Sequence, residues 1–593
     1  MSRSRYLTIA LIIVLGATVL RTLWLRADPP TTSVGIVFHD EGPWTHNARN
    51  QALWGVWQTD NWNPVYIAPV FTALEYVAFE AFGVGTWQAR TVPAASGIAA
   101  VILLMMGLSA LAGRRIALIG GALLAVEYTW VMWNRAALME STMTAFIVAG
   151  WAAYALGSKR PIWGFVAGLA TALAWFTKAA AAFFAAAIVL DALVTLAASR
   201  PALRSRLGMT APANNDVRAA VFTLAGMTVA FGAIGLAFVV PHWNDYWFYN
   251  VQMSVERKPS YDLASLQYRA TMLGVVQDIF TRMWPLLVLA AAGILGIFVR
   301  WRDAKPGERL LALWVLVGWL ELVVHDSSTE RRYVMFVPAV IALASLVLGS
   351  GASILPARAT STAASWRSRL ITLPVWLGLA YVTFGSGLRP FLLAPGTEHP
   401  YSLAVRVATA LAAVTVLCAL VWWPAIARTL SSRGIGTKLA GAIILIMLAW
   451  NLGQYARWAA HHDDVNYRAS MELGRLLPPG TLVQGKLANG LALDNRIRPI
   501  FVGNGFGNYA DRFDRNDVRY ILTYDLPWVG YESQRGLIEE ILDRYPNRQS
   551  VATFVVDETP GADRAVLIDK HPPGLKTRGS APAAASGLHR ARD

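Results

Sequence analysis

The chain has 593 residues, of which 55% are hydrophobic and only 15% are charged, and its mean hydropathy is +0.41. Soluble domains carry roughly 25% charged residues, so the composition excludes an ordinary soluble protein. The net charge of +15 does not indicate a nucleic-acid partner, because the segment after residue 458 has as many acidic as basic residues and the excess lies between apolar runs. One cysteine, Cys418, excludes an intramolecular disulfide and a cysteine-based zinc site.

Apolar runs recur from Tyr6 to Trp458, each long enough to cross about 30 Å of hydrocarbon. They predict a mainly α-helical, polytopic membrane protein with about 13 transmembrane helices. The first run is followed by RADPPTTS, which has no small-residue cleavage site, so we expect an uncleaved first span. The expected spans are residues 6–25, 89–111, 116–133, 142–157, 161–176, 179–197, 219–241, 283–299, 310–324, 333–349, 370–386, 403–424 and 439–458.

Residues 65–82, VYIAPVFTALEYVAFEAF, are long enough for a span but contain Glu75 and Glu80. Segments on the cytoplasmic side are usually rich in Lys and Arg. If residues 65–82 lie along the outer interface, the basic segments fall inside; if they cross the membrane, most basic segments fall outside. We therefore predict an interfacial helix, a cytoplasmic N-terminus and an extracytoplasmic C-terminal part, in the plasma (inner) membrane.

The first outer segment contains FHDEGPWTHNARN, residues 38–50. Gly42 and Pro43 favour a helix start, with Pro43 at the first helical position. Asp40 and Glu41 then lie in the turn before that helix, near its positive end, where a carboxylate stays ionised and can act as a general base toward a hydroxyl. The alternative is a helix cap in a solvated turn. The position directly after the first span favours a function.

After Trp458 the sequence predicts a small α/β domain. A helix, YRASMELGRLL, precedes five short β-rich runs, TLVQG, PIFVG, RYILTYD, SVATFVVDE and RAVLIDK, and a second helix, ESQRGLIEEILDRY, lies among them. The glycine-rich FVGNGFGNYADRF (501–513) is interpreted as a turn, because no βαβ unit supports dinucleotide binding. We predict a transmembrane domain over 1–458, whose first outer loop (26–88) holds two interfacial helices, a soluble extracytoplasmic domain over 459–573 and a disordered tail over 574–593.

Five motifs in chain order resemble those of the GT-C fold glycosyltransferases, and family 39 in particular, the group of protein O-mannosyltransferases and aminoarabinose transferases. The first is the acidic pair of the first outer loop, ahead of two interfacial helices. The other four are GVGTWQARTVPAASG (83–97), WNRAALMESTMTAFIV (133–148), GLATALAWFTKAAAAFF (168–184) and RRYVMFVPAVIAL (331–343).

The resemblance implies transfer of a sugar from a polyprenyl-phosphate donor to a hydroxyl of a protein, lipid or glycan on the outer membrane face, with inversion at the anomeric carbon. It implies that Asp40 is the catalytic base and that Glu41 orients the site. Two departures are visible. NWNPVYIAP (61–69) lacks the lysine of the E-K-P-P signature of aminoarabinose transferases, and Leu138 replaces the second arginine of the second-loop motif.

A lipid-phosphate donor carries its own leaving group, so the site needs a base and cations for the departing phosphate, but neither an acid nor a nucleotide-binding metal. The expected phosphate-binding residues are Arg135, Lys178, Arg331, Arg332 and Tyr333. The alternatives are an interfacial lysine at 178, a loop ion pair between Arg135 and Glu140, and interface anchors at the start of the last motif.

The expected substrate contacts are Glu140, His242 and Trp243, the last two in the aromatic-rich loop 241–263, which could equally form an interfacial belt. Outer-face histidines and acids leave a divalent metal open, although their spacing matches no standard ligand set. A transporter or flippase of lipid-linked glycans would show inverted repeats, and we find none. A glycan polymerase or ligase that uses polyprenyl diphosphate differs only in its donor.

Overall fold

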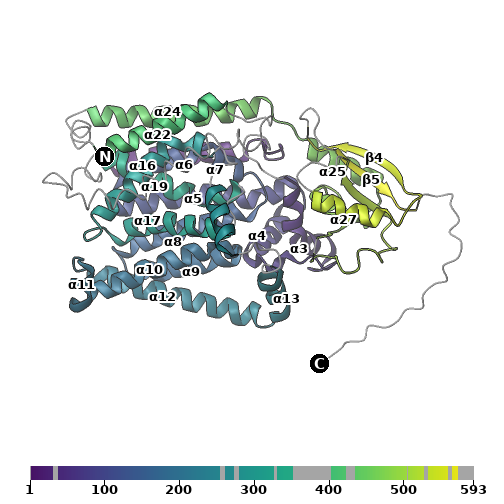
Figure 1. Ribbon diagram of the computed structural model, residues 1–593, viewed down its shortest axis with the longest axis horizontal. Coiled ribbons are helices and arrows are strands. Elements are labelled where there is room, and N and C mark those ends of the chain that lie inside the picture. The colour runs from purple at the N-terminus through teal and green to yellow at the C-terminus, as the bar shows by residue number, and fades with distance from the viewer. Residues whose placement is uncertain are drawn as a thin grey trace.

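The computed structural model describes residues 2–30, 38–253, 261–272, 279–325, 330–350, 402–422, 435–503, 505–525, 532–557 and 564–571. Long helices form a bundle, and a small sheet near the C-terminus lies at one end of it (Figure 1). This arrangement confirms the predicted fold class. The expected span at 370–386 and the expected tail at 574–593 lie outside the described residues.

The bundle helices follow the predicted spans closely. Six of the described helices are long and apolar enough to cross a membrane, and three further apolar helices are shorter. The bundle helices and the short helices between them are α1 (Arg3–Thr22), α5 (Thr86–Leu111), α6 (Arg114–Val126), α7 (Tyr128–Trp133), α8 (Met139–Gly157), α9 (Ile162–Thr177), η3 (Ala179–Ala181), α10 (Ala182–Ser199), α11 (Pro201–Leu207), α12 (Asn214–Ile234), α15 (Leu263–Met272), α16 (Ile279–Val299), α17 (Pro306–Val324), α18 (Glu330–Val334), α19 (Val337–Ser350), α22 (Leu403–Trp422) and α24 (Ile435–Ala460).

Two predicted elements differ from the structure. The span at 116–133 is divided between α6 and α7 at Glu127, whose carboxylate accepts a hydrogen bond from the backbone nitrogen of Trp130 at 2.6 Å. A side chain that caps a new helix start in this way interrupts an apolar run that hydrophobicity alone reads as continuous. The expected loop at 241–263 begins with α13 (Trp243–Trp247) and the π-helix η5 (Phe248–Gln252), and another π-helix, η4 (Gly235–Val239), precedes them.

The first outer segment contains η1 (Phe38–Asp40), α3 (Glu41–Trp54), η2 (Pro64–Tyr66) and α4 (Pro69–Phe82). Helix α3 begins at Glu41, two residues earlier than we predicted from Pro43. Pro43 is compatible with this earlier start, because a proline in the first turn of a helix removes no helical hydrogen bond. Helix α4 buries one face and exposes Leu74, Val77 and Phe82 on another. An exposed apolar stripe is what a helix along the membrane interface presents to lipid.

The C-terminal sheet has five strands in the order β2-β1-β3-β5-β4. Strand β1 is parallel to β2 and β3, whereas β5 is antiparallel to β3 and β4. All five strands and both long helices correspond to predicted runs. The elements are α25 (Val465–Leu476), β1 (Leu482–Gln484), α26 (Lys486–Gly490), β2 (Arg498–Ile500), β3 (Tyr520–Tyr524), α27 (Glu532–Leu542), β4 (Gln549–Val555) and β5 (Arg564–Asp569).

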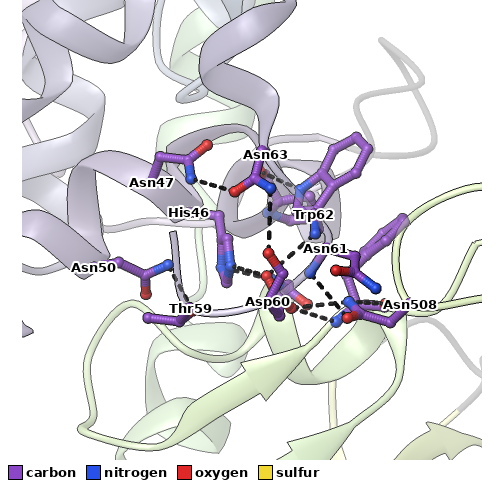
Figure 2. Close-up of polar contacts among 12 residues, drawn as sticks. His46, Asn47, Asn50, Thr59, Asp60, Asn61, Trp62, Asn63 and Asn508 are labelled. Atoms are coloured by element: carbon purple, nitrogen blue, oxygen red, sulfur yellow. Dashed lines mark hydrogen bonds and ion pairs between the residues drawn. The ribbon is translucent and has the colours of Figure 1, made fainter. Parts of the chain in front are cut away.

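Buried polar contacts join the C-terminal part to the first outer segment (Figure 2). Asp60 lies at the centre of these contacts: its carboxylate accepts from Nε2 of His46 at 2.9 Å and from Nδ2 of Asn508 at 3.0 Å. The other ring nitrogen of His46 accepts from Asn489 in α26 at 3.1 Å. Because both ring nitrogens are used, the imidazole of His46 is fixed between the two parts of the chain.

An arginine from α3 completes this joint. The guanidinium of Arg49 is buried and donates to the carbonyl oxygens of Ala492, Asn495 and Ile497 at 2.9 to 3.1 Å. Trp62 stacks on Phe501 with ring centroids 4.5 Å apart. The C-terminal part is therefore docked through hydrogen bonds and ring packing.

The backbones of α3 and α26 approach each other directly at this joint. A Cβ atom on Gly42 would overlap the carbonyl oxygen of Asn489, and a Cβ atom on Gly490 would lie 2.7 Å from Cβ of His39. Glycines are thus required on both sides of the contact for steric reasons.

We predict that Gly42→Ala weakens the joint by about 1–3 kcal/mol, the usual consequence of overpacking a close contact. The variant should show a lower unfolding temperature and faster trypsin cleavage after Arg468, which is exposed in α25 of the C-terminal part. Gly453→Ala in α24 is the matched control, because nothing lies within 4 Å of its Cβ position. Equal proteolysis of both variants would contradict the prediction.

Candidate active site

Asp40 lies between two cations that come from different parts of the chain. Its Oδ1 atom is 2.8 Å from Nζ of Lys486 in α26, and its Oδ2 atom is 3.2 Å from Nη1 of Arg331 in α18. The three side chains are partly accessible, with exposed fractions of 14%, 18% and 26% for Asp40, Lys486 and Arg331. An incoming anion can therefore reach the two cations.

Arg331 also faces a second acid. Its Nε atom is 3.8 Å from Oε1 of Glu140 at the start of α8, and the same carboxylate oxygen forms an ion pair with Lys178, at the end of α9. The charge of Arg332 acts on both Glu140 and Lys178. We call Asp40, Glu140, Lys178, Arg331, Arg332 and Lys486 the charge cluster.

The electrostatics of the charge cluster set its protonation. Burial alone would raise the pKa of the Asp40 carboxyl, but the positive charges of Lys486 and Arg331 outweigh it and hold the pKa well below the ordinary value. Burial lowers the pKa of the Lys178 ammonium to about 8, an effect that Glu140 opposes and Arg332 reinforces. At neutral pH the cluster thus contains an ionised Asp40 and a mainly charged Lys178.

Glu41 is held in a different way from its neighbour Asp40. Its two oxygens accept from Nε and Nη2 of Arg90 at 2.9 and 2.7 Å, and Oε1 also accepts from the backbone nitrogen of Ala137 at 2.6 Å. Glu41 is buried, with 3% of its surface exposed. These contacts hold the Glu41 carboxylate in place and so fix the start of α3.

His39 is buried beside Asp40. Its Nδ1 atom is 2.8 Å from the hydroxyl of Tyr524 in β3. Burial, together with the charge of Lys486, lowers the pKa of the imidazole to about 3, although Asp40 opposes the shift. His39 is therefore neutral at physiological pH and contributes no cation to the site.

The described contacts of four other expected site residues are not with the charge cluster. Arg135 donates to the carbonyl oxygens at the end of α1, those of Leu20, Arg21 and Trp24, and lies over the ring of Trp458. Tyr333 is buried against Phe280. His242 and Trp243 are exposed at the start of α13. The structure therefore brings together Asp40, Glu140, Lys178, Arg331 and Arg332.

Lys486 is the residue that sequence reasoning missed. A signal existed: Lys486 lies two residues after β1, a strand with parallel neighbours, and side chains at the carboxyl ends of parallel strands commonly bind ligands. Arg90 is included only within the motif at residues 83–97, and its ion pair with Glu41 is not predicted from the sequence.

Among the described residues, no group of three or more His, Cys, Asp or Glu side chains has the geometry to hold a metal ion.

Glu75 is a second buried acid near Glu41. Its side chain is fully buried in α4, and neither carboxylate oxygen has a hydrogen-bond partner within the described part of the chain. Burial raises the pKa of Glu75 well above its ordinary value, and the negative charge of Glu41 adds to the shift. The folded protein therefore holds the proton of Glu75 to a higher pH than the unfolded chain does.

A carboxylate flanked by two cations thus lies at the end of the helical bundle. Residues 66–213 match the sequence profile of the family described as dolichyl-phosphate-mannose-protein mannosyltransferase. This match confirms the predicted resemblance and the predicted enzyme class, a polyprenyl-phosphate-sugar-dependent membrane glycosyltransferase. Among curated proteins, no sequence matches the chain.

Several solved structures are similar to this one. ArnT from Cupriavidus metallidurans bound to undecaprenyl phosphate is 19% identical, with a TM-score of 0.48 over 96% of this chain and 98% of that chain. The apo form of ArnT is 18% identical, with a TM-score of 0.49 over 96% and 97%. The oligosaccharyltransferase AglB from Archaeoglobus fulgidus, in complex with an inhibitory peptide and a dolichol-phosphate, is 13% identical, with a TM-score of 0.44 over 87% and 69%.

We predict that Glu75→Gln stabilises the protein, and more so at pH 8 than at pH 5. The unfolded chain releases the proton of Glu75 above about pH 4.3, whereas the folded chain keeps it, so wild-type stability falls as pH rises toward the folded pKa. Glutamine has the same shape and no proton to release.

Thermal unfolding of both proteins at the two pH values checks this. Glu80→Gln, on the exposed face of α4, is the matched control. An effect of Glu75→Gln that does not change with pH would show that the carboxyl is ionised in the folded state.

Proposed function

We propose that the protein transfers a sugar from a polyprenyl-phosphate donor to an acceptor hydroxyl on the outer face of the membrane, with inversion and with Asp40 as general base. The observation that carries the proposal is the position of Asp40, an accessible carboxylate between Lys486 and Arg331. The acceptor is a protein, lipid or glycan; the family profile over residues 66–213 favours mannose as the first sugar to test.

The chemistry follows from the charges. The acceptor oxygen attacks the anomeric carbon and its proton passes to Asp40, while the bond from that carbon to the phosphate oxygen breaks and its electron pair stays on the phosphate. The lipid phosphate thereby gains a second negative charge. Lys178, Arg331 and Arg332 are the cations that we assign to this charge, because fixed cations stabilise a leaving phosphate best where water is scarce. Glu140 sets their positions through its contacts with Lys178 and Arg331.

Replacement of Asp40 by asparagine should lower the transfer rate by about 10² to 10⁴-fold, the usual contribution of a positioned general base. The assay follows a labelled sugar from polyprenyl-phosphate mannose to acceptors in membranes, with and without EDTA to test the metal alternative. Asp517→Asn is the control, since Asp517 forms an exposed ion pair with Arg515 in the C-terminal part. Full activity in Asp40→Asn would eliminate the assigned mechanism.

The proposal includes an orientation in the plasma (inner) membrane. In Figure 1 the N-terminus and α11 lie at one end of the bundle, and α3, α4, α13 and the C-terminal sheet lie at the other. Helix α11 belongs to a segment rich in arginine, as cytoplasmic loops are. The charge cluster would then face the outside.

A fusion of alkaline phosphatase to the C-terminus should accordingly be active in intact bacterial cells, because that enzyme folds only outside the cytoplasm. A fusion at residue 208, directly after α11, should be inactive. The opposite pattern would reverse the orientation and place the charge cluster on the cytoplasmic side.

A further inference from the structure

Lys486 reaches Asp40 because of the backbone that precedes it. Gly485, between β1 and α26, has φ +126°, a conformation that side chains other than glycine rarely adopt. A Cβ atom there would also overlap the carbonyl oxygen of Leu522 in β3. This turn directs the chain out of the sheet, so that Lys486 begins a short helix packed on η1 and α3.

An anchoring function does not account for the Lys486–Asp40 contact. Arg49, His46, Asn508 and Trp62 already hold the C-terminal part against the first outer segment. By contrast, a lysine at hydrogen-bond distance from Asp40 keeps that carboxylate a weak base, which hinders catalysis unless the lysine moves to another anion during the reaction.

The formal charge of the six residues in the charge cluster favours such an anion. Its four cations and two carboxylates sum to a formal charge of +2, whereas the donor phosphate carries −1 before transfer and the lipid phosphate product up to −2. Lys486 and Arg331 approach Asp40 through different oxygens, so both can contact a phosphate that arrives beside this carboxylate.

We propose that Lys486 is a donor-binding residue of the transferase, supplied by the C-terminal part of the chain, so that the active site is complete only when α26 is docked. The inference rests on the proposed function. In the donor-free protein Lys486 pairs with Asp40. When the lipid-linked phosphate binds, Lys486 contacts it, and the pKa of Asp40 rises toward a value suited to accept the acceptor proton. After the anomeric carbon–oxygen bond breaks, Lys486 stabilises the electron pair left on the phosphate.

The test uses full-length protein in lipid nanodiscs and measures the Kd for undecaprenyl phosphate by tryptophan fluorescence. Lys486→Gln should weaken binding about tenfold or more, the scale of a lost charge-assisted hydrogen bond to phosphate. Lys486→Arg should bind nearly as well as the wild type, since it retains the charge. Arg519→Gln is the control: it removes a partly exposed cation of the same part of the chain, paired with Asp569.

A double-variant cycle separates donor binding from anchoring. Asp40→Asn releases Lys486, so it should tighten binding of undecaprenyl phosphate, and the double variant Asp40→Asn/Lys486→Gln should lose most of that gain. If Lys486 were only an anchor, Lys486→Gln would lower the amount of folded protein and leave Kd unchanged, which would overturn the inference.

Transfer kinetics distinguish this failure from a failure of the proposed function. If the wild type transfers sugar from polyprenyl-phosphate mannose and Lys486→Gln has an unchanged donor KM, Lys486 does not bind donor and the proposed function stands. If the wild type transfers no sugar from any polyprenyl-phosphate donor, the proposed function is wrong, and the inference that rests on it falls as well.

Discussion

The buried ion pair between Arg90 and Glu41 fixes the position of the whole outer site. Arg90 donates to both oxygens of Glu41 and, through Nη1, to the carbonyl oxygens of Leu25, Arg26 and Ala27. One guanidinium thus joins the end of α1, the start of α3 and the first turns of α5. Removing one partner of such a pair generally costs about 3–5 kcal/mol, because the other charge stays buried. Asp40 immediately precedes Glu41, so this pair also fixes where Asp40 lies.

The charge cluster can exist because its charges alternate. From the C-terminal part to the bundle the order is Lys486, Asp40, Arg331, Glu140 and Lys178, with an acid between each pair of cations. Isolated buried charges are strongly unfavourable, whereas this order supplies each cation with a carboxylate. The same order lets an added phosphate share cations that the two acids already hold in place. Glu75 has no such partner among the described residues, and burial raises the pKa of its carboxyl well above the ordinary value.

Much of the fold follows from local sequence patterns. The apolar runs identify the bundle helices, and the five β-rich runs identify the strands of the C-terminal sheet, because both signals depend on periodicity within one segment. The division at Glu127 was not predictable in this way, since it depends on a carboxylate that caps a new helix. Within the site, Asp40, Glu140, Lys178 and Arg331, which the resemblance named, lie together. It also included Arg135, whose guanidinium instead bonds to the backbone at the end of α1.

The contact between Lys486 and Asp40 could not be predicted from local sequence patterns, because the two residues are 446 positions apart in the chain. Such a contact depends on how two distant parts of the chain pack together. Here that docking is set by steric features, the bare backbones of Gly42 and Gly490 and the turn at Gly485. A lysine placed by such a joint moves with it. If α26 shifted away from η1, Asp40 would lose one of its two cations while Arg331 and the bundle stayed in place. The C-terminal part therefore has a direct electrostatic effect on the carboxylate that we assign as the base, and any partner that alters its docking would alter that carboxylate too.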